Sequence, residues 1–194
     1  MASTSSLARQ LQPALRMLLV LTVLCGVAYP LFVLGVGQVV GHSSANGSLL
    51  DRSGAVVGSS SLGQDVTDPQ WFQGRRSASA YAGTISGGSN LGPSSDDLTK
   101  ALTDARTALV AANADAVGAP PADALAASGS GLDPDISPEY ARWQAPRVAA
   151  ARHLAVATVD SLVDAHTKGR LLGFLGEPRV NVTELNLALA SATS

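Results

Sequence analysis

The stretch SGSGLDPDIS, residues 128–137, has the composition of a loop that could bind phosphate. Glycine-rich loops bind phosphate through backbone N–H groups that small side chains leave accessible. The alternative is a turn, in which glycine supplies φ > 0 and an Asp-Pro pair fixes the direction of the chain. The residues that define the loop are Ser128, Gly129, Ser130, Gly131, Asp133 and Pro134.

The motif requirements favour the turn. A Walker-type loop needs a lysine followed by Ser or Thr after its glycines, and no Gly-Lys-Ser or Gly-Lys-Thr occurs in the chain. A dinucleotide fingerprint needs a third glycine at fixed spacing, and none follows Gly129 and Gly131 at that spacing. We therefore interpret this stretch as a turn between helices, with Ser137 capping the next helix.

The other residues capable of chemistry form no recognisable pattern. The three histidines are not near another His or Cys at metal-ligand spacing. Asp133 and Asp135, which flank a proline, are more typical of caps and turns than of a cation site. A nucleophile elbow, Gly-x-Ser-x-Gly, is absent from the sequence. We predict no catalytic residues, no metal site and no cofactor bound by this chain.

The charge balance argues against a nucleic-acid partner. The formal net charge is −2, and the longest basic run is Arg75-Arg76. Nucleic-acid-binding domains usually carry a basic patch or stripe that neutralises phosphates. The chain has one cysteine, so no intrachain disulfide can form.

An uncharged segment, MLLVLTVLCGVAYPLFVLGVGQVV, extends from Met17 to Val40. As a helix rising about 1.5 Å per residue it is about 36 Å long, enough to cross a hydrocarbon core roughly 30 Å thick. A cleaved signal peptide is the main alternative, but its apolar region is typically only about 7–15 residues long. We expect an uncleaved transmembrane helix.

Basic residues near this segment predict its orientation. Arg9 and Arg16 precede it, and the next arginine or lysine is Arg52. Cytoplasmic flanks carry the excess of Lys and Arg, so the N-terminus is expected in the cytoplasm. The predicted organisation is a cytoplasmic tail (1–16), a transmembrane helix (17–40) and an extracytoplasmic domain (41–194) at the cell membrane.

Small residues and a proline suggest that the transmembrane helix packs against other membrane helices. Gly37 and Gly41 form a Gly-x-x-x-Gly pair, which permits close contact between helices. Pro30 removes a backbone donor and predicts a kink. The alternative is a plain lipid anchor whose glycines have no partner. The predicted packing residues are Gly26, Tyr29, Pro30, Gly35, Gly37 and Gly41.

The rest of the chain predicts mostly helix. Helical spacing of apolar residues and an acidic first turn predict a helix over Ser95–Asn113. A short helical turn is expected at 122–127, and Pro138 at a first helical position begins another helix. We expect Pro146 to break or restart that helix, followed by helix over 147–158 and a further helix over 159–168.

Strand signals are fewer. A short strand is expected near 54–57. Asn181 and Glu184 resemble a capping box before a final helix, although alternating leucines leave a strand open there. Trp71, Phe72 and Tyr81 are expected to anchor an otherwise aromatic-poor core, with residues of an interface as the alternative. The predicted class is α+β: one N-terminal transmembrane helix, then a helix-rich extracytoplasmic domain with a small β-sheet.

Seven segments in order resemble one known family. They are YPLF at Tyr29, ANGSL at Ala45, GSSSLGQ at Gly58, SGGSNLGP at Ser86, SGSGLDPDIS at Ser128, RVAAAR at Arg147 and LGFLGEPRVNV at Leu172. This order resembles the C subunit of the Kdp potassium-transporting P-type ATPase, a bacterial complex. Two departures are Arg76, where the family usually has proline, and Val66, where an aromatic residue is more usual.

The resemblance implies a non-catalytic, single-pass subunit of an ATP-driven, high-affinity potassium importer. Its partners would be a potassium-channel-like subunit, an ATP-hydrolysing P-type subunit and a small stabilising subunit, all in a lipid membrane. The family is described as raising the pump subunit's affinity for ATP, so ATP is implied through that subunit, and a nucleotide-binding chaperone is the alternative function. The predicted orientation places residues 128–137 away from cytoplasmic ATP, so the residues themselves favour a role in assembly and stabilisation.

Overall fold

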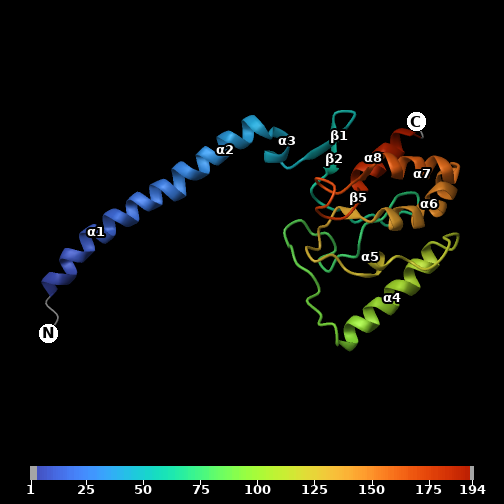
Figure 1. The fold of residues 1–194 in the computed structure, drawn as a ribbon, viewed down its shortest axis with the longest axis horizontal. Coiled ribbons are helices and arrows are strands. Elements are labelled where there is room, and N and C mark those ends of the chain that lie inside the picture. Colours follow the sequence, from blue (N-terminus) through green and yellow to red (C-terminus); the bar gives the residue numbers. More distant parts are fainter. Residues whose placement is uncertain (1–3, 193–194) are drawn as a thin grey trace. The chain divides into compact units, whose positions relative to one another are not determined.

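A computed structural model describes residues 4–192 of the chain (Figure 1). The chain divides into two compact units, Met1–Ser48 and Leu49–Ser194. The first unit consists of helix α1 (Thr4–Val23), the π-helical turn η1 (Leu24–Ala28), helix α2 (Tyr29–Val40) and the short helix α3 (His42–Ala45). Within it, Arg9–Val40 is long and apolar enough to cross a membrane. Part of the predicted tail is therefore helical, because α1 begins at Thr4.

The helix is interrupted by a π turn directly before Pro30. The Tyr29 N–H donates to the Leu24 carbonyl, five residues back. In a regular α-helix the Pro30 ring would crowd the carbonyl of Gly26, and the proline could not donate a hydrogen bond to it. A π turn inserts one extra residue into the helix and is one of the recognised ways to accommodate such a disruption.

The end of α2 is closed by the residues that follow it. Helix α2 stops at Gly41, and α3 turns back so that the Cβ of Ala45 lies 3.5 Å from where a Gly37 Cβ would be. The side chains of Gln38 and Asn46 exchange hydrogen bonds of 3.0 and 3.3 Å. The first polar residues after the apolar segment thus form a helical turn.

The second unit contains two small antiparallel sheets. Strands β1 (Leu49–Arg52) and β2 (Ala55–Ser59) form a hairpin, which includes the strand predicted near 54–57. Strands β3 (Asp135–Ile136), β4 (Thr167–Lys168) and β5 (Arg179–Asn181) form a second sheet in the order β3-β5-β4.

The helices of the second unit are α4 (Asp96–Ala112), α5 (Ala122–Leu125), α6 (Pro138–Arg152), α7 (Val156–Ala165) and α8 (Val182–Ala192). The first two agree with the helices predicted over 95–113 and 122–127. Together with the small sheets and the long N-terminal helix, they confirm the predicted mixture of helix and strand.

The prediction that Pro146 breaks or restarts a helix is wrong. Helix α6 continues through Pro146 from Pro138 to Arg152. Ala145, Val148 and Ala149, on either side of the proline, are buried. Tertiary packing supplies most helical stability in proteins, and here it outweighs the hydrogen bond that proline cannot make.

The predicted helices over 147–158 and 159–168 also have the wrong boundaries. Helix α6 ends where His153 adopts the left-handed conformation, with φ of 56°. Helix α7 then begins at Val156, and residues 167–168 form β4. The end of α6 depends on a left-handed residue that is not glycine, so the usual sequence signal for a helix C-terminus is missing.

The final helix follows the capping prediction. Asn181 Oδ1 accepts the Glu184 N–H at 3.1 Å, and helix α8 begins at Val182. Leu185 and Leu189, four residues apart, are fully buried. That helical spacing excludes the strand that the alternating leucines left open.

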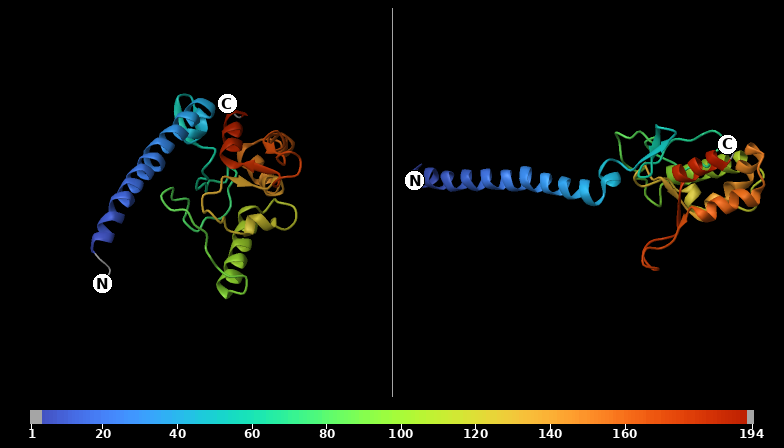
Figure 2. Two further views of the ribbon diagram at one scale, coloured as in Figure 1. Left: turned by 60° about the vertical axis from the view of Figure 1, so that its left-hand side comes forward. Right: turned by 90° about the horizontal axis from the view of Figure 1, so that it is seen from above.

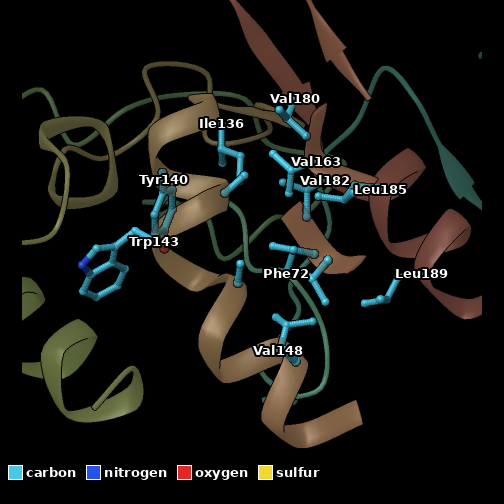
Figure 3. Close-up of a cluster of buried hydrophobic side chains, with 14 of the residues drawn as sticks. Phe72, Ile136, Tyr140, Trp143, Val148, Val163, Val180, Val182, Leu185 and Leu189 are labelled. Carbon is cyan, nitrogen blue, oxygen red and sulfur yellow. The ribbon is translucent and has the colours of Figure 1, made fainter. Parts of the chain in front are cut away.

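The core lies among α6, α7, α8 and the second sheet (Figure 3). Phe72, from an irregular segment, is fully buried at its centre, as predicted. Trp71 is partly buried and packs against the core, whereas Tyr81 is half-buried outside this cluster. The other side chains labelled in the figure are Ile136, Tyr140, Trp143, Val148, Val163, Val180, Val182, Leu185 and Leu189.

Candidate functional site

Residues 128–137, called the motif loop below, link α5 to α6 as predicted. Gly131 has φ of 68°, a conformation that favours glycine. Asp133 Oδ1 accepts the Asp135 N–H at 3.0 Å, and Ser137 Oγ caps α6 by accepting the Tyr140 N–H at 2.9 Å. The loop also contains β3, a strand with no local signal in the sequence, because its pairing partner lies more than forty residues further along the chain.

One side of the motif loop is bound to residues 76–87. The Ser128 N–H donates to the Arg76 carbonyl at 2.8 Å. The Ser130 carbonyl accepts the Gly87 N–H at 2.8 Å and the Ser86 hydroxyl at 3.1 Å. The segments SGGSNLGP and SGSGLDPDIS, recognised separately in the sequence, therefore lie side by side in the fold.

Two further motifs bind the second half of the loop. The Leu132 carbonyl accepts the Gly63 N–H at 2.8 Å, and the Pro134 carbonyl accepts the Val182 N–H at 2.9 Å. Asn181 Nδ2 donates to Asp135 Oδ1 at 3.2 Å. Since Gly63 belongs to GSSSLGQ and Val182 to LGFLGEPRVNV, three motifs converge on the motif loop.

Close backbone approaches explain why glycines stand at this junction. A Cβ on Gly131 would lie 2.6 Å from Ser79 Oγ and 2.8 Å from the Gly87 carbonyl. A Cβ on Gly63 would lie 2.5 Å from both the Asp133 carbonyl and the Tyr81 ring. Burial raises the pKa of Tyr81 to about 12, and its hydroxyl donates to the Arg75 carbonyl.

Several amides of the motif loop are committed within the chain. The N–H groups of Ser128, Gly131, Leu132 and Asp135 all donate to protein oxygens. A phosphate cradle instead directs successive N–H groups at its ligand. The geometry thus matches the turn interpretation of this stretch.

The carboxylates of the loop are paired with arginines. Arg75 contacts Asp133 at 3.0 Å, and Arg179 contacts Asp135 at 3.0 Å. Burial raises the pKa of Asp135, and the positive charge of Arg179 only partly opposes that effect. Both ion pairs line a hollow of about 710 Å³, and Glu139 is part of the same lining. Within residues 4–192, no group of three or more His, Cys, Asp or Glu side chains is arranged to hold a metal ion.

A second feature is the way in which the irregular segment 63–95 is held. Its residues form no helix or strand, so its buried backbone groups need other partners. Gln144 on α6 accepts the Gln73 N–H at 2.8 Å and donates to the Gln73 carbonyl at 3.0 Å. Asn186 on α8 does the same for Phe72, at 2.8 Å in both directions.

The two arginines of RVAAAR hold the same segment. Arg147, only 7% exposed, donates to the carbonyls of Pro69 and Trp71, to Asn113 Oδ1 at 2.7 Å and to Gln144 Oε1 at 2.8 Å. These acceptors are neutral, and burial lowers the pKa of Arg147. A guanidinium with five fixed donors suits such a cluster of oxygens.

Arg152 completes this arrangement. Its guanidinium lies 3.7 Å from the centre of the Trp71 ring, and its Nε donates to the Gln70 carbonyl at 3.1 Å. The roles of these two arginines were not predicted from the sequence. The available signal was a buried polar stripe: Tyr140, Gln144 and Arg147 share one helix face at spacings of four and three residues.

The predicted packing residues all lie in the first unit. A Cβ on Gly35 would have no protein atom within 4 Å, and one on Gly26 would meet only Thr22 at 3.9 Å. Gly37 is covered by Ala45, and Gly41 ends α2. The remaining two, Tyr29 and Pro30, are exposed beside the π turn. Packing of these residues against other helices stays a prediction.

Within residues 4–192, these observations define a class of protein with one helix long and apolar enough to cross a membrane and one domain whose sequence motifs form an internal scaffold. A family model described as "K+-transporting ATPase, c chain" matches residues 11–191. The chain belongs to this family.

Similar proteins are named "Potassium-transporting ATPase KdpC subunit". The protein of Kineococcus radiotolerans is 52% identical over 190 residues, covering 97% of this chain and 96% of the relative. That of Rhodopseudomonas palustris is 48% identical over 199 residues, covering 95% and 98%. That of Streptomyces avermitilis is 49% identical over 212 residues, covering 96% of each. The resemblance drawn from the seven sequence segments is thereby confirmed.

Proposed function

We propose that this chain is a non-catalytic, accessory subunit of an ATP-driven potassium importer, where it stabilises the assembled complex and supports the ATP-hydrolysing subunit. Membership of the c-chain family supports the placement in a potassium-transporting ATPase. The accessory role is supported by one observation: the motif loop makes its hydrogen bonds with other segments of the same chain. A loop engaged in this way supports a domain's shape, and that domain is then available to bind partner subunits.

The proposal includes an orientation and a set of partners. The N-terminus lies in the cytoplasm and the second unit lies outside, as the arginines before the apolar segment favour. The partners are a channel-like subunit, the ATP-hydrolysing subunit and a small stabilising subunit. In this orientation the motif loop faces away from cytoplasmic ATP, so support of the pump subunit is transmitted through subunit contacts.

Cysteine labelling on intact cells tests this orientation. Cys25 is the only cysteine, so a Cys25→Ser background permits single reporters. Val117→Cys in the second unit is a suitable reporter because Val117 is 91% exposed. A membrane-impermeant thiol reagent is expected to label it on intact cells, whereas Ser5→Cys in the N-terminal tail should label only after lysis.

The reverse pattern would contradict the orientation. Labelling of Ser5→Cys on intact cells, with Val117→Cys protected until lysis, would place the second unit beside the ATP pool. The nucleotide-binding chaperone would then become the better interpretation of the motif loop.

A further inference from the structure

A hollow of about 460 Å³, called the α8 hollow below, opens between the β1–β2 hairpin, the start of the irregular segment and helix α8. The hairpin lies beside α8 (Figure 2), and Arg52 of β1 donates to the Ala190 carbonyl of α8 at 3.3 Å. Small-molecule sites in proteins usually enclose about 300–1,000 Å³. No described residue of the motif loop lines the α8 hollow, so it is a separate feature of the second unit.

The inner surface of the α8 hollow is mainly apolar. Val182 and Ala190, near the two ends of α8, are buried, and Val66 and Leu187 are partly buried. The Trp71 ring forms part of the same surface. A concave apolar surface of this kind, with few polar groups around it, is typical of a site that takes an apolar ligand body.

The amide side chains in the wall of the hollow are engaged within the chain. Asn186 exchanges two hydrogen bonds of 2.8 Å with the backbone of Phe72. Gln64 Nε2 donates to the Val57 carbonyl at 3.3 Å. These side chains therefore hold the walls of the hollow in place.

The two carboxylates in the lining are also compensated. Asp68 accepts the Gln70 N–H at 3.0 Å and Gln70 Nε2 at 2.7 Å. These bonds are the main reason that the pKa of Asp68 is lowered, and arginine side chains on α6 lower it further. Asp65 also lines a neighbouring hollow, where Arg75 and Arg76 oppose its charge. Neither carboxylate is therefore a strong attractor for a cation.

Arg52 is the charged residue of the lining that has donors to offer. Within residues 4–192 it makes one hydrogen bond, to the neutral Ala190 carbonyl, and no ion pair, whereas a guanidinium has five N–H donors. Burial lowers the pKa of Arg152, Asp68 partly opposes this effect, and the positive charge of Arg52 reinforces it. The two arginine charges are thus close together, and the Arg52 end of the hollow attracts an anion.

We propose that the α8 hollow binds a long-chain carboxylate, with its carboxylate on Arg52 and its apolar chain against Trp71 and Leu187. A guanidinium matches a carboxylate through two parallel N–H···O bonds. A single negative charge suits the site, because Asp65 and Asp68 would repel a second one. This site goes beyond the accessory role and does not depend on it, since every residue in it belongs to the second unit of this chain.

Quenching of Trp71 fluorescence tests the binding directly. The chain has two tryptophans, so Trp143→Phe in the full-length chain leaves Trp71 as the only one. The probe is undecanoate with bromine on its terminal carbon, added to the chain in phosphatidylcholine nanodiscs. Bromine quenches indole fluorescence at short range only, so we expect saturable quenching. The matching bromoundecanol, which lacks the charge, is expected to bind about tenfold more weakly.

Three variants on this background locate the site. Arg52→Gln is expected to weaken binding of the carboxylate by about tenfold and to leave binding of the alcohol unchanged. Val66→Phe fills the hollow and should abolish saturable quenching by both probes. Arg142→Gln is the control, because Arg142 pairs with Asp164 on α7 and does not line the hollow, and its binding should match that of the background chain.

Circular dichroism checks that each variant keeps its fold, and the unsubstituted chain compared with Trp71→Phe gives the same measurement if Trp143→Phe unfolds. Quenching that does not saturate, equal affinities for the carboxylate and the alcohol, or unchanged binding in Val66→Phe would each overturn the proposal. The measurement uses this chain alone, so its failure would leave the proposed accessory function standing.

Discussion

Gly131 and Gly63 show how single residues determine the junction of the sequence motifs. Each lies where a Cβ would come within 2.9 Å of a backbone carbonyl oxygen: that of Gly87 for Gly131 and that of Asp133 for Gly63. Contacts of that length with backbone atoms cannot be relieved by rotating a side chain, so the neighbouring segment would have to move. At these positions glycine permits two loops to touch.

Gly131→Ala is expected to destabilise the domain by about 3 kcal/mol, because it adds left-handed strain to a steric clash. Gly129→Ala is the matched control, since a Cβ there would meet no atom within 4 Å, and its effect should stay within about 1 kcal/mol. Chemical unfolding of the purified chain in detergent, followed by circular dichroism, measures both. Equal effects of the two substitutions would contradict the close-packing explanation.

At this scale the sequence predicted the local structure of the motif loop better than its contacts. Glycines, an Asp-Pro pair and Ser137 before Pro138 have local meanings, and the turn and the helix cap were confirmed. The hydrogen bonds from Gly63, Gly87 and Val182 join residues that are far apart in the chain, so no local pattern announces them. The sequence resemblance selected the right segments without indicating that they meet.

Helix α6 is the element that organises the second unit. Its buried face is partly polar and holds the irregular segment 63–95 through Gln144 and Arg147. If the buried face of α6 were wholly apolar, the backbone groups of that segment would lack partners. Each buried group without a partner would cost about 1–3 kcal/mol. The polar stripe and the absence of regular structure in the segment are therefore linked.

Arg147→Met should destabilise the second unit by about 3 kcal/mol or more, because it leaves the Asn113 Oδ1 atom and the Trp71 carbonyl without their donor. Arg142→Met on the same helix is the control. Arg142 pairs with Asp164 at 2.6 Å, but both side chains are about half exposed, and such pairs contribute about 1 kcal/mol or less. Thermal unfolding should give a clearly lower melting temperature for Arg147→Met than for Arg142→Met. Similar melting temperatures would argue against a stabilising role of the Arg147 hydrogen bonds.

Elements with strong local signals were predicted, and those that depend on distant partners were not. Helix α4 and the start of α8 followed from periodicity and capping. Strands β3 and β4 are only two residues long and exist through their pairing with β5. A strand this short has no periodicity to detect, which explains why the sequence placed a helix across 167–168.

At the scale of the whole molecule, the first unit offers a test of helix packing in the assembled complex. Gly35→Leu is expected to lower recovery of the chain with its partner subunits by about fivefold, equivalent to about 1 kcal/mol of association free energy. Gly35 is suited to the test because its helix surface is open, whereas Gly37 is covered by Ala45. Affinity purification through a partner subunit provides the measurement.

Val39→Leu serves as the control for this experiment, because Val39 is 86% exposed and already large. Its recovery should match that of the unsubstituted chain. Unchanged recovery of Gly35→Leu as well would favour the plain lipid anchor over a packed helix.

The clamping of residues 63–95 from later parts of the chain also constrains when the protein can finish folding. The hydrogen-bond partner of Gln73 is Gln144, 71 positions further along the chain, and that of Phe72 is Asn186, 114 positions further along. Contacts over such separations form slowly because long loops must close first. During synthesis the segment emerges early and remains unprotected until α8 has left the ribosome. In unfinished chains Phe72 and Gln73 are therefore open to proteases, whereas in finished chains α8 and α6 hold them.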